Sequence, residues 1–191
     1  MLHNDAWHFW QIGRNLERGL FTLFTMRQVF LKLQDERAEG GGYSVDAVNL
    51  DALLRMLTGQ YAYRSSYLSR PVASQVARLL LQDEDFPRSV ACCLQGVRDA
   101  SKRCFGDRNI GSSAHLVHQC ENVLSELFLT DVRRYFLMEE STAAEDTSIG
   151  VQSRAQSFAE WLDSIAQRLL SLGTLMADYS VDQSNYLSSS S

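Results

Sequence analysis

Hydrophobic residues recur at helical spacing along most of the chain, and residues 155–176 give the clearest case. Successive hydrophobic positions there are separated by steps of three and four: Ala155, Phe158, Leu162, Ile165, Leu169, Leu172 and Met176. These steps place all seven side chains on one face of an α-helix. The segment therefore predicts a long helix whose apolar face forms the seam of a helix bundle.

Residues 7–33 predict a second long helix that is apolar on nearly every side. At about 100° per residue, one side holds Phe9, Ile12, Leu16, Leu20 and Leu23. The opposite side holds Trp7, Trp10, Arg14, Phe21 and Thr25. A helix that is apolar all round is typical of the middle of a bundle, so we expect this helix at the centre.

Three charged residues, Arg14, Glu17 and Arg18, lie close together within this apolar segment. Their spacing of three and four residues lets the side chains meet on the helix surface. Buried charges are costly unless they are paired. The group is thus either an ionic lock between neighbouring helices, the more common role of such networks, or a binding or catalytic site.

The remaining segments also predict helices. Pro71 and Pro87, the only prolines, each stand where a helix would begin. The helices are expected from about residue 44 or 49 to 67 with an interruption near Gly59, and over 71–81, 87–105 and 112–139. Flexible or polar connections are expected at 39–43, 106–111 and 140–150. These elements predict an all-α antiparallel bundle of six to seven helices, one domain over residues 1–180, with a disordered tail at 181–191.

Composition and charge narrow the class of protein. The 191 residues are 45% hydrophobic and 21% charged, as expected for one globular domain. No apolar run approaches about 18 residues and no signal peptide is recognisable, so we expect a cytoplasmic protein without a membrane span. The net charge of -5 argues against nucleic-acid binding. Cys92, Cys93, Cys104 and Cys120 lack CxxC spacing and are expected to be reduced thiols of the core.

Motifs for metals and nucleotides are weak or missing. His115 and His118 are three residues apart, but no Glu-x-x-His motif accompanies them, so a metal site is not expected. The glycine-rich segment 39–43 lacks the spacing of a phosphate-binding loop, and no G-x-S-x-G motif occurs. We therefore expect no cofactor.

Two short segments are further candidates for binding. If Pro87 opens a helix, its N-terminus beside Arg88 could hold an anion, but the acidic residues before it, with a cap near Asp85 or Phe86, explain the pattern more simply. Arg64, between Tyr63 and Tyr67, belongs either to a polar binding group or to a helix contact from which its guanidinium extends outward.

Three sequence blocks resemble the bacterial alpha-E family. They are W-x-F-x-x-I-G-R-x-L-E-R at 7–18, A-Y-R-x-x-Y at 62–67 and L-L-L-x-D-x-D-F-P-R-S-V at 79–90. The resemblance is to the C-terminal portion of a longer family domain, so the chain is either a shortened member or part of a larger protein. The family's Glu-Arg motif maps onto Glu17 and Arg18. Leu20 and Phe24 stand where the family commonly has charged residues, which favours a packing role for the motif.

The resemblance implies a function. Members of the family are typically encoded beside, or fused to, circularly permuted ATP-grasp proteins and transglutaminase-like proteins, with a proposed role in peptide synthesis or modification. We therefore expect a non-enzymatic helical companion of an ATP-grasp-type peptide ligase.

Two alternatives remain. The first is an enzyme or ligand-binding bundle that grips a carboxylate or phosphate, with Glu17 as acid or base. It requires five residues to converge on one pocket: Arg14, Glu17, Arg18, Arg64 and Arg88. The second is a homo-oligomer whose interface is formed by the final helix.

Overall fold

The structure is a computed structural model that describes residues 5–38, 43–105, 111–136 and 148–188. Within these ranges the chain forms seven α-helices, one short 3₁₀ helix and no strand. The expected all-α bundle is therefore confirmed for the described part of the chain.

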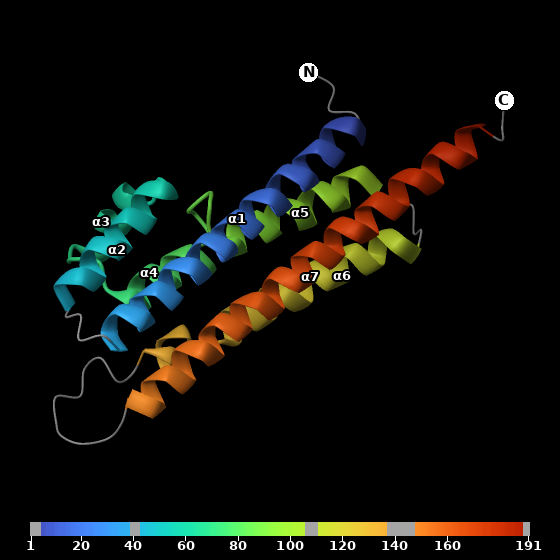
Figure 1. Cartoon of the computed structure of the whole chain (residues 1–191). Coiled ribbons are helices and arrows are strands. Elements are labelled where there is room, and N and C mark those ends of the chain that lie inside the picture. Colours follow the sequence, from blue (N-terminus) through green and yellow to red (C-terminus); the bar gives the residue numbers. More distant parts are fainter. Residues whose placement is uncertain (1–4, 39–42, 106–110, 137–147, 189–191) are drawn as a thin grey trace.

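Four long helices build the body of the molecule (Figure 1): α1 (Asp5–Ala38), α5 (Val90–Phe105), α6 (Gly111–Leu129) and α7 (Ser148–Ser188). Helix α1 packs against α5 on one side and α7 on the other, and α6 closes the ring between α5 and α7. Neighbouring helices run in opposite directions, which is the up-and-down arrangement of a four-helix bundle.

Three shorter helices cover the end of the bundle at which α1 terminates: α2 (Tyr43–Met56), α3 (Gln60–Tyr67) and α4 (Ala73–Gln82). The 3₁₀ helix η1 (Val132–Tyr135) follows α6 and packs against α4 and α7. The expected interruption near Gly59 is confirmed. The chain turns there through Thr58 in the left-handed region, at a φ of 55°, and the Gly59 amide donates to the Leu54 carbonyl over 2.7 Å.

The predicted seam of α7 forms part of the core. Its described members are buried: Phe158, Leu162, Ile165, Leu169, Leu172 and Met176. Ala155 lies outside the residues whose side chains are described. This face packs against α1 and α6 inside one chain, so it belongs to the core of the bundle. A homo-oligomer interface on another side of the final helix stays a prediction.

Helix α1 is not the central helix that its composition predicted. One side is in the core, where Ile12, Leu16 and Leu23 are buried. The other side faces outward and leaves large parts of Trp10 and Phe21 exposed. A ring of four helices has no central member, so each helix keeps one side free.

Three helix boundaries also differ from those that the sequence predicted. Helix α5 begins at Val90 rather than at Pro87, and α7 continues to Ser188, through most of the expected tail. Helix α6 ends at Leu129 instead of about residue 139, because the Gln82 side chain of α4 donates hydrogen bonds to the carbonyls of Leu127 and Thr130. The predicted connections at 39–42, 106–110 and 140–147 lie outside the described residues.

Candidate functional site

The turn between α4 and α5, residues 83–88, is organised by its own side chains. Asp83 accepts hydrogen bonds through Oδ1 from the backbone amides of Asp85 at 3.0 Å and Phe86 at 2.7 Å. Ser89 then caps α5, since its Oγ accepts from the amide of Cys92 at 3.0 Å and donates to the carbonyl of Asp83. The capping interpretation of this segment therefore fits better than the anion site, and the cap is Ser89 rather than Asp85 or Phe86.

This turn packs on the middle of α1, beside Arg18. Thr22, one turn further along α1 and fully buried, donates a hydrogen bond of 2.8 Å to the backbone carbonyl of Arg88. The guanidinium groups of Arg18 and Arg88 both act electrostatically on the thiol of Cys93. The fold thus brings together two of the sequence blocks that resemble the alpha-E family, residues 7–18 and 79–90. The sequence did not predict this proximity.

The cysteines at this junction do not form a reactive thiol site. Burial raises the pKa of Cys93 to about 12, and the nearby arginines oppose this only in part. Burial also raises the pKa of Cys92, to which the carboxylates of Asp83 and Asp85 contribute. Because the thiolate is the nucleophile, both groups are weak nucleophiles at neutral pH. The four cysteines, all of them described, are thiols rather than disulfides, but only Cys93 and Cys120 are buried.

Arg14 and Glu17 point away from this junction. The Arg14 guanidinium lies over the ring of Trp10, 5.1 Å from its centroid, and Glu17 is exposed. Among the described residues, neither they nor Arg18 form an ion pair within 4 Å. The expected buried ionic lock is therefore wrong, because Arg14 and Glu17 lie on the outer side of α1 while Arg18 lies at the α1–α5 junction.

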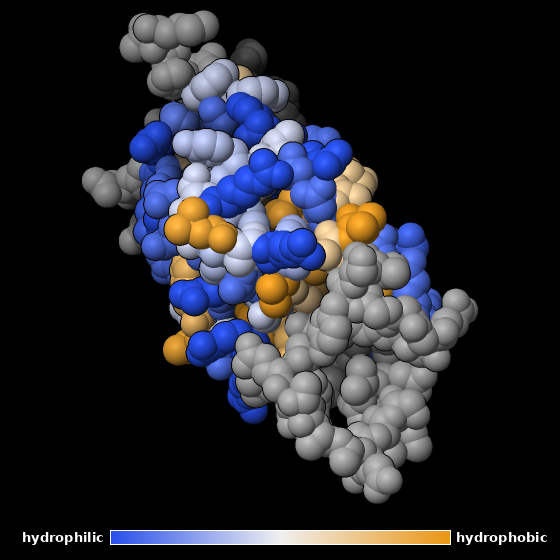
Figure 2. Space-filling view, turned by 90° about the vertical axis from the view of Figure 1, so that its left-hand side faces the viewer, coloured by the Kyte–Doolittle hydropathy of each residue, from blue (hydrophilic) through white to orange (hydrophobic). Residues whose placement is uncertain are grey.

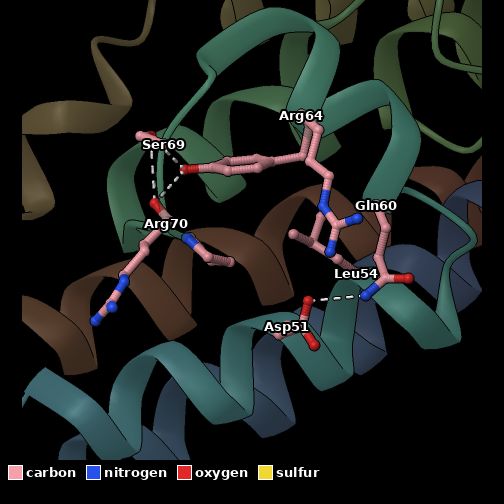
Figure 3. A pocket seen from close by; sticks show the side chains of 8 residues that line it. Asp51, Leu54, Gln60, Arg64, Ser69 and Arg70 are labelled. Atoms are coloured by element: carbon pink, nitrogen blue, oxygen red, sulfur yellow. Dashed lines mark hydrogen bonds between the residues drawn. The ribbon is translucent and has the colours of Figure 1, made fainter.

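Arg64 belongs to a separate pocket of about 270 Å³ between α2, α3 and the segment before α4 (Figure 3). The lining residues are Asp51, Leu54, Gln60, Tyr63, Arg64, Ser69, Arg70 and Pro71. In Figure 3 the guanidinium of Arg64 is directed toward Asp51 and Gln60, whereas that of Arg70 extends away from them. The pocket therefore presents a cation beside an anion.

Hydrogen bonds fix the two walls of this pocket. Gln60 donates through Nε2 to Oδ1 of Asp51 at 2.8 Å. This bond, with the positive charges of Arg55 and Arg64, lowers the pKa of Asp51. On the other wall the buried Tyr63 hydroxyl donates to Oε1 of Gln75 at 2.6 Å and accepts from the amide of Val72 at 3.1 Å. Asp51 is therefore charged at neutral pH, and Tyr63 holds the wall in place.

The five charged candidates consequently lie in three places. Arg14 and Glu17 are on the outer side of α1, and Arg18 and Arg88 flank the α1–α5 junction. Arg64 is on α3, which packs on α2 and α4. They do not converge on one pocket, so the five-residue site is wrong. The sequence did not indicate Asp51 and Gln60 as site residues, because only the fold brings α2 and α3 together. The one sequence signal for Asp51 was its position four residues before Arg55, the spacing of an ion pair on a helix.

Among the described residues no group of three or more His, Cys, Asp and Glu side chains could hold a metal ion. His115 and His118 are exposed. The described helices include none with the length and hydropathy needed to cross a membrane.

Hydrophobic surface is divided into small spots at the end of the molecule that carries α2, α3 and α4. Figure 2 looks onto this end and shows, in its coloured part, hydrophobic atoms scattered among hydrophilic ones. The Arg64 pocket is likewise lined mainly by polar side chains.

The fold and its charged surfaces define an all-helical bundle protein with a mixed-charge pocket in its α2–α4 cap. Comparison with known families assigns it more closely: a family model described as a predicted alpha-helical domain with a conserved ER motif matches residues 1–179. The chain therefore belongs to the Alpha-E family. No curated protein and no solved structure matches it.

Proposed function

We propose that the chain is a non-catalytic helical companion of an ATP-grasp-type peptide ligase, or of a transglutaminase-like protein, in peptide synthesis or modification. Membership of the Alpha-E family supports the proposal, because the resemblance implies these partners. Since such a ligase consumes ATP, we place the pair in the cytoplasm.

The observation that carries the proposal is the separation of the charged candidates. An acid–base site needs its groups within hydrogen-bond reach of one reacting centre. Here the carboxylate of Glu17 lies on an outward helix face, whereas Arg18 and Arg88 act at the α1–α5 junction and Arg64 on α3. Charged groups on separate surfaces are better suited to binding a partner protein than to catalysing a reaction at one site.

Co-expression tests this proposal directly. The tagged chain is produced together with an ATP-grasp protein from the same genome, and the ligase is assayed by release of ADP with and without the chain. We expect the two proteins to co-purify and the rate of ADP release to rise. The same tag on an unrelated helical bundle is the control. Absence of both association and rate change would contradict the proposal.

A second candidate function is the binding of a carboxylate in the Arg64 pocket. The guanidinium of Arg64 points into the pocket beside the charged Asp51, an arrangement complementary to a group that carries both a carboxylate and an ammonium, such as a peptide or amino acid. Asp51 already offsets part of the charge of Arg64, so the expected affinity is weak, with a Kd of about 1 mM.

NMR titration with a dipeptide tests this candidate. Amide signals of α3 and of residues 69–72 are expected to shift with the dipeptide, and less with its C-terminal amide. Arg64→Gln should abolish the shifts, whereas Arg78→Gln, on the exposed side of α4, should leave them unchanged. Equal shifts with the dipeptide and its amide would argue against recognition of a carboxylate.

A further inference from the structure

The outward face of α1 carries a heptad pattern that the intramolecular core does not use. Its positions follow in steps of three and four: Trp7, Trp10, Arg14, Glu17, Phe21 and Phe24. The exposed fractions of the four aromatic residues are 37%, 51%, 46% and 46% in chain order. Steps that alternate in this way place the side chains on one narrow line along a helix, as in the seam of a coiled coil. We call these six residues the outer stripe.

The outer stripe is complementary to its own reverse: the aromatic positions match from both ends, and the two central charges have opposite signs. Two aromatic residues come first, then a cation and an anion, then two further aromatic residues. If a second α1 lies antiparallel across it, centred between residues 15 and 16, Arg14 meets Glu17 of the second copy and Trp10 meets Phe21 of the second copy. Trp7 and Phe24 form the outermost layers, and the six layers span about 26 Å of helix.

The central charges are suited to pairing between two chains. Arg14 makes no ion pair within the described part of its own chain and rests over the ring of Trp10, while Glu17 is exposed. A two-fold axis produces the Arg14–Glu17 contact twice, with aromatic layers on both sides that exclude water. Both charges are then satisfied without rearrangement of the bundle.

The flanks of the outer stripe allow a second helix to approach. Gly13 lies beside it, and a Cβ built there has no atom within 4 Å, so the surface is open. Arg27, on the flank of α1, is already paired with Asp163 of α7 at 2.7 Å. Its charge therefore does not oppose association.

We propose that α1 binds α1 of a second copy of this chain in an antiparallel, two-fold symmetric interface along the outer stripe. Between 37% and 51% of each aromatic residue remains exposed, so these four residues supply roughly 350 Å² per copy. This is below the ~800 Å² per partner of a standard stable interface. The dimer is therefore of moderate strength and dissociates on dilution.

Sedimentation velocity of the full chain over a dilution series tests the proposal. We expect the mass to double between low and high concentration. Phe21→Arg should weaken the dimer by about 30-fold or more, as expected for loss of an aromatic anchor. Phe128→Arg is the matched control, because Phe128 is exposed to 45% on α6, and it should leave dimerisation unchanged. Circular dichroism checks that both variants remain helical.

Charge reversal tests the register. Arg14→Glu or Glu17→Arg alone places like charges across the two-fold axis, so each variant should be monomeric. The double variant Arg14→Glu/Glu17→Arg restores opposite charges and should dimerise again. An equimolar mixture of the two single variants should form a heterodimer, because each supplies the charge that the other lacks.

Three outcomes would overturn the proposal. A wild-type chain that stays monomeric at all concentrations has no such interface. This holds even if a different protein binds to the outer stripe. Dimerisation that survives Phe21→Arg unchanged uses another surface. Failure of the double variant to regain the dimer that each single reversal lost would rule out the antiparallel pairing of Arg14 with Glu17.

Discussion

The hydroxyl of Thr22 donates a hydrogen bond of 2.8 Å to the backbone carbonyl of Arg88 and thereby joins the middle of α1 to the turn that precedes α5. The two residues are 66 positions apart. Thr22 is fully buried and Arg88 is half-buried, and a carbonyl shielded from water and left without a donor costs free energy. This contact fixes where the segment 83–88 sits on α1, beside Arg18.

Thr22→Val is expected to lower the free energy of unfolding by about 1–3 kcal/mol, because valine has nearly the same shape and leaves the Arg88 carbonyl without its donor. Urea unfolding followed by circular dichroism measures the change. Thr25→Val is the control, since the hydroxyl of Thr25 bonds only to the Phe21 carbonyl of its own helix. Equal effects of the two substitutions would mean that the link to Arg88 adds no stability.

Gln82→Ala should destabilise the end of α6. The Gln82 side chain donates to the Thr130 carbonyl at 2.8 Å and also to the Leu127 carbonyl, and carbonyls at the end of a helix need such partners. We expect a loss of roughly 1–2 kcal/mol and faster hydrogen exchange over residues 127–135. Gln156→Ala, which removes an exposed contact with Glu160 on α7, should change neither.

Stability is expected to fall in alkaline solution. Burial raises the pKa of Cys93 and of Cys120 to about 12 from an ordinary value of 9.0. Between these values the unfolded chain releases its thiol protons while the folded chain keeps them, so stability is complete below pH 9.0 and is lost as the pH rises toward 12. Each thiol contributes roughly 1 kcal/mol per pH unit to this slope.

The alkaline slope is tested by urea unfolding at several pH values above and below the ordinary thiol pKa. The double variant Cys93→Ala/Cys120→Ala should be less stable at neutral pH, because it leaves small cavities, but its stability should fall less steeply in alkali. Identical slopes for wild type and variant would show that other groups, such as tyrosines and lysines, cause the loss.

Two glycines inside helices should respond differently to alanine. A Cβ on Gly96 of α5 would lie 2.5 Å from Nδ2 of Asn15 on α1, whereas a Cβ on Gly173 of α7 would meet only Leu16 Cδ1 at 4.0 Å. Gly173→Ala is therefore expected to stabilise the chain by about 0.5–1 kcal/mol through helix propensity. Gly96→Ala should lose this gain, because the Asn15 side chain has to move. Thermal unfolding measures the stability of both variants. An equal gain in stability would show that the contact between α1 and α5 can hold an additional methyl group.

Much of the fold was predictable from periodicity, because an apolar face at helical spacing must be buried somewhere. The steps from Phe158 to Met176 identified α7 and its buried side correctly. The candidate site was less predictable. Arg64 was recognised as a candidate, but its neighbour Asp51 was not, since the two become close only when α3 folds back on α2.

The amino-acid sequence by itself determined the helical class, the break near Gly59, the buried face of α7 and the resemblance to the Alpha-E family, because these depend on spacing and local chemistry along the chain. Only the tertiary structure decided that α6 stops at Leu129, where Gln82 from α4 satisfies its carbonyls. It also decided that Arg14 and Glu17 face outward while Arg18 faces the α1–α5 junction. A helix that is apolar on every side can turn either side to the core, and the neighbours α5 and α7 select which side is buried.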